Sequence, residues 1–212
     1  MRRFIVDGPR QLSEAAEAAR DLLEQWSGPP PERVVLAGMG GSALSGGIVE
    51  ALSLLRGTPP RGSFHVAREY DLRVPVGPKT LVIAISYSGD TEETLSAYRQ
   101  AVTAGAQVIA VASGGRLLDA AAEDRDQGVR SVTIPPQAPG FQPRFSLYYT
   151  SAFLLSILRG LGLLEHPFDP AALRLHLESL MDSSEAAGGT LGALLGGGIP
   201  VVYSSPCFET GL

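Results

Sequence analysis

The clearest buried segment of the sequence is a five-residue run of aliphatic residues, Leu81-Val82-Ile83-Ala84-Ile85. An aliphatic and β-branched run of this length is typical of a strand that is buried on both faces, as in a parallel sheet. The residues after it, Ser86–Asp90, are polar and include a glycine, and a helical pattern begins at Thr91. A buried strand, a loop and a helix in this order form half of a βαβ unit, so the run favours an α/β architecture.

Similar runs alternate with helical patterns along the first part of the chain. Further strands are expected over residues 34–37, 64–67, 108–111 and 129–134. Helices are expected over residues 15–26, with Ser13 as N-cap, and over 42–55, 91–104 and 117–122. We therefore predict a three-layer αβα sandwich around a five-stranded parallel sheet, of the flavodoxin-like kind.

The pattern changes after Pro135-Pro136. Residues 147–163 predict a long apolar helix, and residues 170–187 an amphipathic one whose apolar face carries Leu173, Leu177 and Leu180. Residues 199–205 are typical of a new strand with no helix behind it. We expect three parts: a domain over 1–146, linker helices over 147–195, and the first strand of a truncated second domain over 196–212.

Composition excludes several classes of protein. Seventeen basic and 22 acidic residues give a net charge of −5, which offers no general attraction to nucleic acid or to an anionic membrane. Cys207 is the only cysteine, so neither an intrachain disulfide nor a zinc site built on several thiolates can form. No apolar run approaches the ~18–20 residues of a membrane span. These features predict a cytoplasmic protein without a membrane or nucleic-acid partner.

Two loops have the composition of an anion site. They are Gly38-Met39-Gly40-Gly41-Ser42-Ala43 and Ser86-Tyr87-Ser88-Gly89-Asp90-Thr91. Each follows a buried strand and opens a helix, which is where open α/β sheets bind ligands. Free N–H groups at the start of a helix favour anions. Hydroxyl groups add uncharged donors, at Ser42, Ser86, Ser88 and Thr91. The loops together predict a phosphate site that uses no lysine.

Two other interpretations of the loops are open. Gly38, Gly40 and Ala43 satisfy the relaxed dinucleotide-binding fingerprint, for which Glu69 is a candidate ribose ligand. The second loop argues against a dinucleotide, because its hydroxyls close the crevice around a single phosphate. Alternatively, Ser88 and Thr91 only cap the helix that follows them.

Taken together, the motifs resemble the sugar isomerase (SIS) domain family, and within it the bifunctional phosphoglucose/phosphomannose isomerases. The resemblance is carried by Gly38–Ser42, by Ser86–Thr94 and by Pro143-Arg144 before an aliphatic-aromatic helix. It covers about residues 10 to 205, with the motifs in order and at fitting separations.

This resemblance implies an aldose–ketose isomerase that acts on glucose 6-phosphate and fructose 6-phosphate through a cis-enediolate, with mannose 6-phosphate as a further candidate substrate. It places Arg144 beside the reacting carbons, where a fixed cation stabilises the developing negative charge. It implies two SIS domains in tandem, no metal or organic cofactor, and a homodimer. It assigns the substrate phosphate to Gly40, Gly41, Ser42, Ser86, Ser88, Gly89 and Thr91.

The family's catalytic carboxylate, histidine and lysine are expected beyond Leu212. The three histidines of this chain, His65, His166 and His176, match none of them by position, and Glu209 comes too early to match the glutamate. Two alternative functions stay open. One is a non-catalytic sugar-phosphate sensor, although the first 30 residues have room for only one helix rather than a DNA-binding motif. The other is an isomerase of amino-sugar or heptose phosphates.

Overall fold

The computed structural model describes residues 2–57, 59–165 and 167–196. A sheet of five strands forms its centre, in the order β2-β1-β3-β4-β5, and every neighbouring pair is parallel. The strands are β1 (Arg33–Gly38), β2 (Ser63–Ala67), β3 (Thr80–Ile85), β4 (Gln107–Ala112) and β5 (Arg130–Thr133). The predicted parallel sheet is confirmed, and each expected strand overlaps an observed one.

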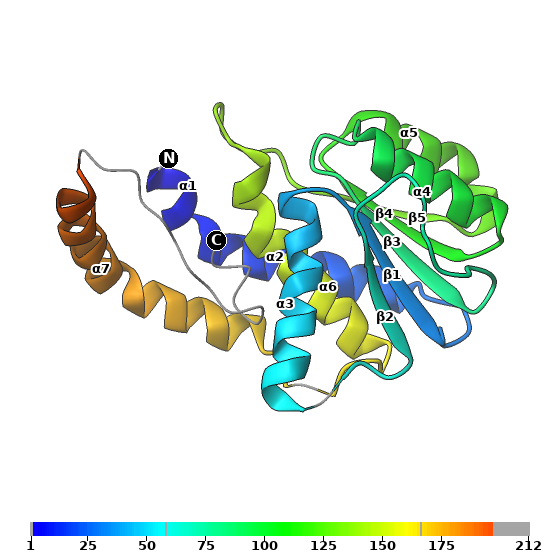
Figure 1. Cartoon of the computed structure of the whole chain (residues 1–212), viewed down its shortest axis with the longest axis horizontal. Helices are drawn as coiled ribbons and strands as arrows, with labels where there is room; N and C mark the ends of the chain where they lie inside the picture. Colours follow the sequence, from blue (N-terminus) through cyan, green and yellow to red (C-terminus); the bar gives the residue numbers. More distant parts are fainter. Residues whose placement is uncertain (1, 58, 166, 197–212) are drawn as a thin grey trace.

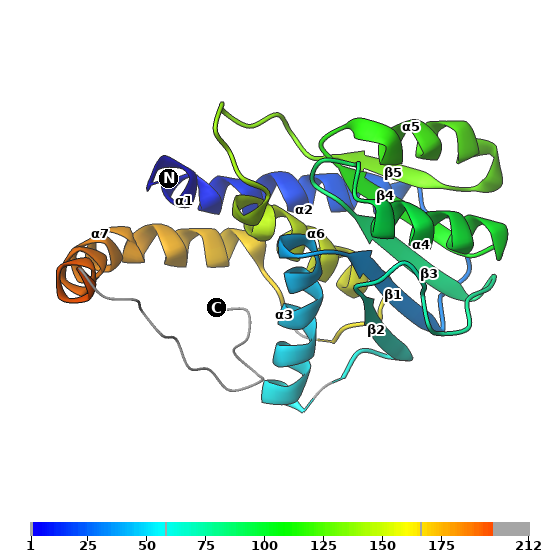
Figure 2. The same cartoon turned by 45° about the horizontal axis from the view of Figure 1, so that its top comes forward.

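Helices cover both faces of the sheet, as Figures 1 and 2 show. One face carries α2 (Gly8–Glu24), α3 (Gly41–Arg56) and α6 (Leu147–Gly160). The other face carries α4 (Glu92–Thr103) and α5 (Gly115–Glu123). The predicted three-layer sandwich is therefore confirmed.

Successive side chains of each strand point to opposite faces of the sheet, and the core therefore consists of two apolar clusters, one on each face. Leu36 and Ile83 face α2 and α6, whereas Val82 and Ala84 face α4 and α5. All six residues of β3 are buried, because this strand lies at the centre of the sheet and is covered on both faces. The absence of polar residues in the run 81–85 is thus explained by its position.

The order of the strands creates a topological switch point, which is the place where the direction of strand addition reverses. The chain runs from β1 outward to edge strand β2, and then returns across β1 to form β3. The helices that follow β1 and β3 consequently lie on opposite faces of the sheet (Figure 2). In open α/β sheets, ligands bind at the carboxyl ends of the two strands that flank such a point.

Helix α6 belongs to the core of the sheet domain. Tyr149, Phe153, Ile157 and Leu158 are at most 1% exposed, and they pack with side chains of α2 and the sheet. The apolar side chains of this helix are therefore buried within one chain, and they give no reason to expect a partner subunit. The helix ends at Gly160, three residues before the expected end at Leu163.

The first and last helices differ from the prediction. A short helix α1 (Arg2–Val6) precedes α2, and α2 begins at Gly8, so Ser13 lies inside the helix instead of capping it. Pro9 explains the early start, because the fixed φ of proline suits the first turn of a helix.

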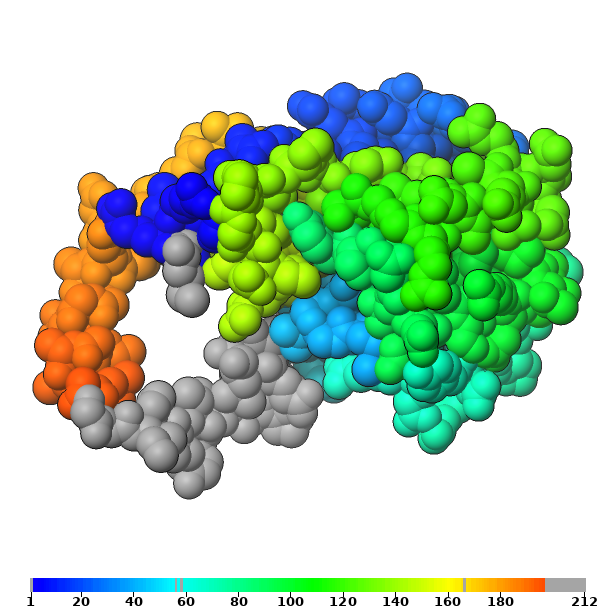
Figure 3. Space-filling view, turned by 90° about the horizontal axis from the view of Figure 1, so that it is seen from above, coloured from blue at the N-terminus to red at the C-terminus, as the bar shows by residue number. Residues whose placement is uncertain are grey.

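Helix α7 (Pro170–Leu195) is longer than the expected 170–187 and extends away from the sheet domain, as Figure 3 shows in orange. Leu173 and Leu177 pack against the core, but Leu180 of the same predicted face is 41% exposed. The predicted strand over 199–205 lies outside the described residues.

None of the described helices combines the length and the apolar character that a membrane span requires.

We predict that Phe153→Ala lowers the free energy of unfolding by about 3–5 kcal/mol, because it leaves a cavity in the core. Urea denaturation of the 212-residue chain measures this difference. Leu194→Ala is the matched control, since Leu194 is 78% exposed on α7, and it should change stability by less than about 0.5 kcal/mol. Equal effects of the two substitutions would contradict the placement of α6 in the core.

Candidate functional site

The two predicted loops lie side by side at the carboxyl edge of the sheet. Gly38 is paired with Ile85 in the β1–β3 ladder, and Ser86 follows directly. A Cβ atom on Gly38 would lie 3.0 Å from the carbonyl oxygen of Ile85 and 3.2 Å from the Cβ of Ser42. A side chain here would be tightly crowded, so the glycine allows the first loop to pack closely against the end of β3.

The first loop also contacts the segment that carries Arg144. Gly40, the residue before α3, has φ +50°, a conformation that glycine adopts without strain. A Cβ on Gly41 would lie 3.3 Å from the Cα of Arg144. Arg144 belongs to a short 3₁₀ helix, η2 (Pro143–Ser146), and its side chain is exposed. The structure thus brings Gly41 and Arg144 together, although 103 residues separate them in the chain.

Hydrogen bonds to its hydroxyl groups give the second loop its shape. The hydroxyl oxygens of Ser86 and Thr91 are 2.8 Å apart, and the N–H of Gly89 donates to Ser86 Oγ at 3.1 Å. The N–H of Asp90 donates to Ser88 Oγ at 3.2 Å. Ser86 is 2% exposed, whereas Ser88 faces solvent. Ser86 and Thr91 therefore close the base of the loop, and Ser88 lies at its open side.

Thr91 occupies the N-cap position of α4, but its side chain makes no capping bond. The interpretation of Thr91 as a helix cap is thus wrong: its hydroxyl is bonded to Ser86 instead. Among the described residues, none accepts a hydrogen bond from the N–H of Thr91, Glu92 or Glu93. Donors of this kind, at the positive end of the helix dipole, favour an anion.

An aromatic cluster that the sequence did not reveal connects these elements. It consists of Phe4, Tyr87, Phe141 and Phe145, whose neighbouring ring centroids are 5.3 to 5.8 Å apart. The cluster joins α1, the second loop and the residue after Arg144. Burial of this kind also raises the pKa of Tyr87. Phe4, Tyr87 and the Phe141/Phe145 pair lie far apart in sequence, so no periodic pattern marks them as neighbours.

A second contact that the sequence did not reveal is the ion pair between Asp90 and Arg116 of α5. The backbone N–H and the guanidinium of Arg116 both donate to Asp90 Oδ1, at 3.2 Å each. These bonds hold the pKa of the Asp90 carboxyl below its usual value. The second loop therefore carries an ionised carboxylate that is paired with a cation.

The remaining candidates lie away from the loops. Glu69 is two residues beyond the end of β2 and is paired with Arg73, which does not fit the ribose ligand of a dinucleotide fold. His65 lies in β2 and His176 is exposed on α7. His166, Cys207 and Glu209 are outside the described residues. Within the described part of the chain, no three His, Cys, Asp or Glu side chains gather as metal ligands.

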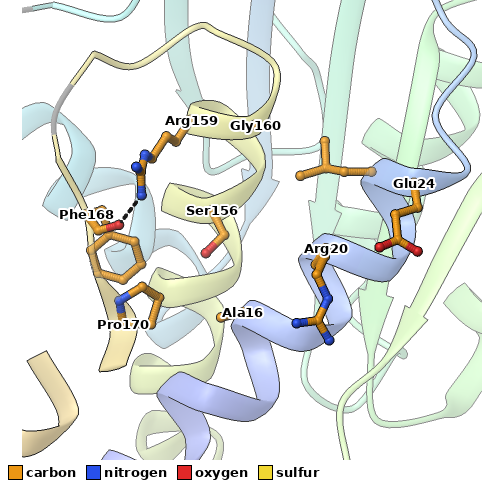
Figure 4. A pocket seen from close by; sticks show the side chains of 9 residues that line it. Ala16, Arg20, Glu24, Ser156, Arg159, Gly160, Phe168 and Pro170 are labelled. Atoms are coloured by element: carbon orange, nitrogen blue, oxygen red, sulfur yellow. Dashed lines mark hydrogen bonds between the residues drawn. The ribbon is translucent and has the colours of Figure 1, made fainter. Parts of the chain in front are cut away.

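A separate pocket of about 550 Å³ lies between α2 and α6 (Figure 4). Arg20 and Glu24 line it from α2, and Arg159 of α6 donates to the carbonyl oxygen of Phe168 at 2.5 Å. None of the predicted site residues lines this pocket. The pocket is therefore distinct from the candidate site formed by the two loops.

One family of known proteins matches the part of the chain that contains both loops. The model of the SIS domain matches residues 30–135, which is half of the chain and spans both loops. The chain belongs to the SIS domain family.

Relatives of this SIS chain include two bifunctional phosphoglucose/phosphomannose isomerases. The one from Caldicellulosiruptor bescii is 40% identical over 74% of this chain and 44% of its own length. The one from Aquifex aeolicus is 33% identical over 95% of this chain and 57% of its own length. The chain therefore spans about half the length of the curated relatives it matches.

A solved structure shares the fold at lower identity. Tagatose-6-phosphate ketose/aldose isomerase from Escherichia coli superimposes with a TM-score of 0.62 at 19% identity, over 93% of this chain and 55% of that one. This likeness shows that the described sheet and helices share the fold of that protein.

We predict that Gly89→Ala destabilises the SIS domain. Gly89 has φ +78°, and a Cβ there would lie 1.8 Å from the carbonyl oxygen of Gly114. Strain and overlap should cost at least about 1–3 kcal/mol in the free energy of unfolding. Gly77→Ala is the control, because no atom lies within 4 Å of its Cβ position. A Gly89→Ala chain as stable as Gly77→Ala would contradict the described packing of the second loop.

Proposed function

We propose that this chain is the phosphate-binding part of an aldose–ketose isomerase that acts on glucose 6-phosphate and fructose 6-phosphate, with mannose 6-phosphate as a further substrate. One observation carries the proposal: two loops rich in glycine and hydroxyl groups meet at the β1–β3 switch point, and the backbone of Arg144 packs on the first of them. The names of the two bacterial isomerases agree with this activity.

In this proposal the substrate phosphate lies between the starts of α3 and α4. Gly40, Gly41 and Gly89 contribute backbone, and the N–H groups at the start of α4 donate to the phosphate oxygens. The hydroxyls nearest to this space belong to Ser42, Ser86, Ser88 and Thr91. No lysine is required, because hydrogen bonds to a charged group are strong even from neutral donors.

Arg144 acts at the other end of the sugar. Proton transfer between C1 and C2 of an open-chain hexose phosphate passes through a cis-enediolate, whose oxygens carry negative charge. A guanidinium stays protonated and donates several hydrogen bonds, so Arg144 stabilises that charge as it develops. Its side chain is exposed and makes no hydrogen bond to another residue in the described part of the chain, which leaves its donors for the substrate.

The proton itself needs a base. Asp90 is the carboxylate of the second loop, but it is ionised and bonded to Arg116. We therefore propose that the carboxylate, histidine and lysine of the reaction come from a second SIS domain in the intact cytoplasmic enzyme, and that neither a metal nor an organic cofactor takes part.

We predict that Ser88→Ala weakens the binding of glucose 6-phosphate about 10- to 150-fold, because a hydrogen bond to a charged group contributes roughly 1.5–3 kcal/mol. Ser88→Asp should bind still more weakly, through repulsion of like charges. Calorimetric titration gives the dissociation constants. Ser179→Ala, an exposed serine of α7, serves as control. Unchanged affinity in Ser88→Asp would refute the phosphate site.

We also predict that the 212-residue chain binds sugar phosphate but isomerises it negligibly. General acid–base groups typically contribute about 10²- to 10⁴-fold to a rate, and the described loops hold no free base. A coupled assay of fructose 6-phosphate conversion compares this chain with a two-domain SIS isomerase. Comparable turnover by the two proteins would show that the base lies within residues 1–212.

For the intact enzyme we propose a homodimer. Helix α7 has no buried residue, and its exposed apolar side chains include Leu175, Leu180, Leu191 and Leu194. Such a helix gains stability when a second surface covers it. Sedimentation of the chain should therefore show association that increases with concentration, and a strict monomer at high micromolar concentration would contradict the proposal.

A further inference from the structure

The segment Ser113–Leu117, which leads from the end of β4 into the first turn of α5 and is called the β4–α5 turn below, supports the second loop. The N–H and the hydroxyl of Ser113 both donate to the carbonyl oxygen of Tyr87, at 2.9 and 2.6 Å. The N–H of Leu117 donates to the carbonyl oxygen of Gly89 at 2.9 Å, and Arg116 Nη2 donates to that of Asp90 at 2.9 Å. The turn thus engages three carbonyl groups of the loop.

This arrangement orients the loop for an anion. A carbonyl oxygen carries partial negative charge, so any carbonyl that faced a phosphate would repel it. Because the carbonyls of Tyr87, Gly89 and Asp90 are engaged by the turn, the loop is free to present N–H and O–H donors on its other side. The turn can come this close only through glycine: a Cβ on Gly115 would lie 2.4 Å from the carbonyl oxygen of Ser88.

Arg116 also brings a positive charge to the second loop. Besides its bond to the Asp90 carbonyl, it makes two bonds to Asp90 Oδ1, one from its backbone N–H and one from Nε. The Asp90 carboxylate is one residue from Thr91, so an unpaired charge there would repel the substrate phosphate. Both side chains are more than half exposed, and exposed ion pairs contribute little to stability. The pair therefore contributes little to folding.

We propose that Arg116 is a positioning residue for phosphate binding: it neutralises the Asp90 carboxylate and holds the Asp90 carbonyl group away from the anion. The proposal rests on the proposed function, because it assigns Arg116 a role in that same phosphate site. Arg116 reaches the phosphate only through Asp90 and the loop backbone.

The experiment is calorimetric titration of glucose 6-phosphate into the 212-residue chain and four variants. Arg116→Gln should raise the dissociation constant roughly fivefold or more, since it leaves one negative charge uncompensated near the ligand. Arg116→Lys should bind better than Arg116→Gln, because it retains the positive charge. The control is Arg61→Gln, which removes a guanidinium from an exposed ion pair with Glu165 just before β2, at the opposite edge of the sheet.

The double variant Asp90→Asn/Arg116→Gln separates charge from structure. If Arg116 acts by neutralising Asp90, the double variant should recover most of the affinity that Arg116→Gln loses. The defect of Arg116→Gln should also shrink at high sodium chloride concentration, because salt screens exposed charges. A purely structural role predicts neither recovery nor salt dependence. Thermal unfolding of each variant should give melting temperatures close to that of the parent.

The two failures are distinguishable. If the parent chain binds glucose 6-phosphate and Arg116→Gln binds it equally well, the positioning role is overturned and the phosphate site stands. If the double variant is as weak as Arg116→Gln, neutralisation of Asp90 is overturned. If the parent chain itself does not bind, the proposed function is overturned and the role of Arg116 with it.

Discussion

The parallel pairing of β1 with β3 determines the position of the candidate site. These strands are neighbours in the sheet although β2 lies between them in the chain, and the ladder sets Gly38 directly beside Ile85. Both strands end at the same edge, and their loops leave toward opposite faces. A space lined by two helix N-termini follows from this topology alone, before any side chain is considered. The glycines and hydroxyls of the two loops then favour an anion in that space.

The elements that hold the two ends of the proposed substrate differ in how they are supported. The two loops of the proposed phosphate site follow the ends of the central strands β1 and β3, and the β4–α5 turn supports the second of them. Arg144 is carried by η2, which contacts Gly41 and is held through Phe145 in the aromatic cluster with Phe4. The N-terminal helix α1 is therefore part of the support for the proposed catalytic arginine, even though it lies far from the loops in sequence.

The sequence predicted well what depends on local pattern. The apolar run 81–85 identified the central strand, and the two loops were placed at strand ends because strand, loop and helix follow one another in the chain. Prediction was wrong where several local signals compete: Pro9 starts α2 earlier than Ser13 suggests, and Thr91 bonds to Ser86 instead of capping α4. The Asp90–Arg116 pair and the aromatic cluster could not be predicted, because such contacts depend on tertiary packing. They produce no periodic pattern in the sequence.

The central claim is that the two loops and Arg144 form one phosphosugar site. Titration of the isotope-labelled 212-residue chain with glucose 6-phosphate, followed by amide chemical shifts, tests it most directly. The account predicts that the largest shifts occur at Gly40–Ser42 and Ser88–Glu93, with a smaller change at Arg144. Shifts confined to the pocket between α2 and α6, around Arg20 and Arg159, would contradict it.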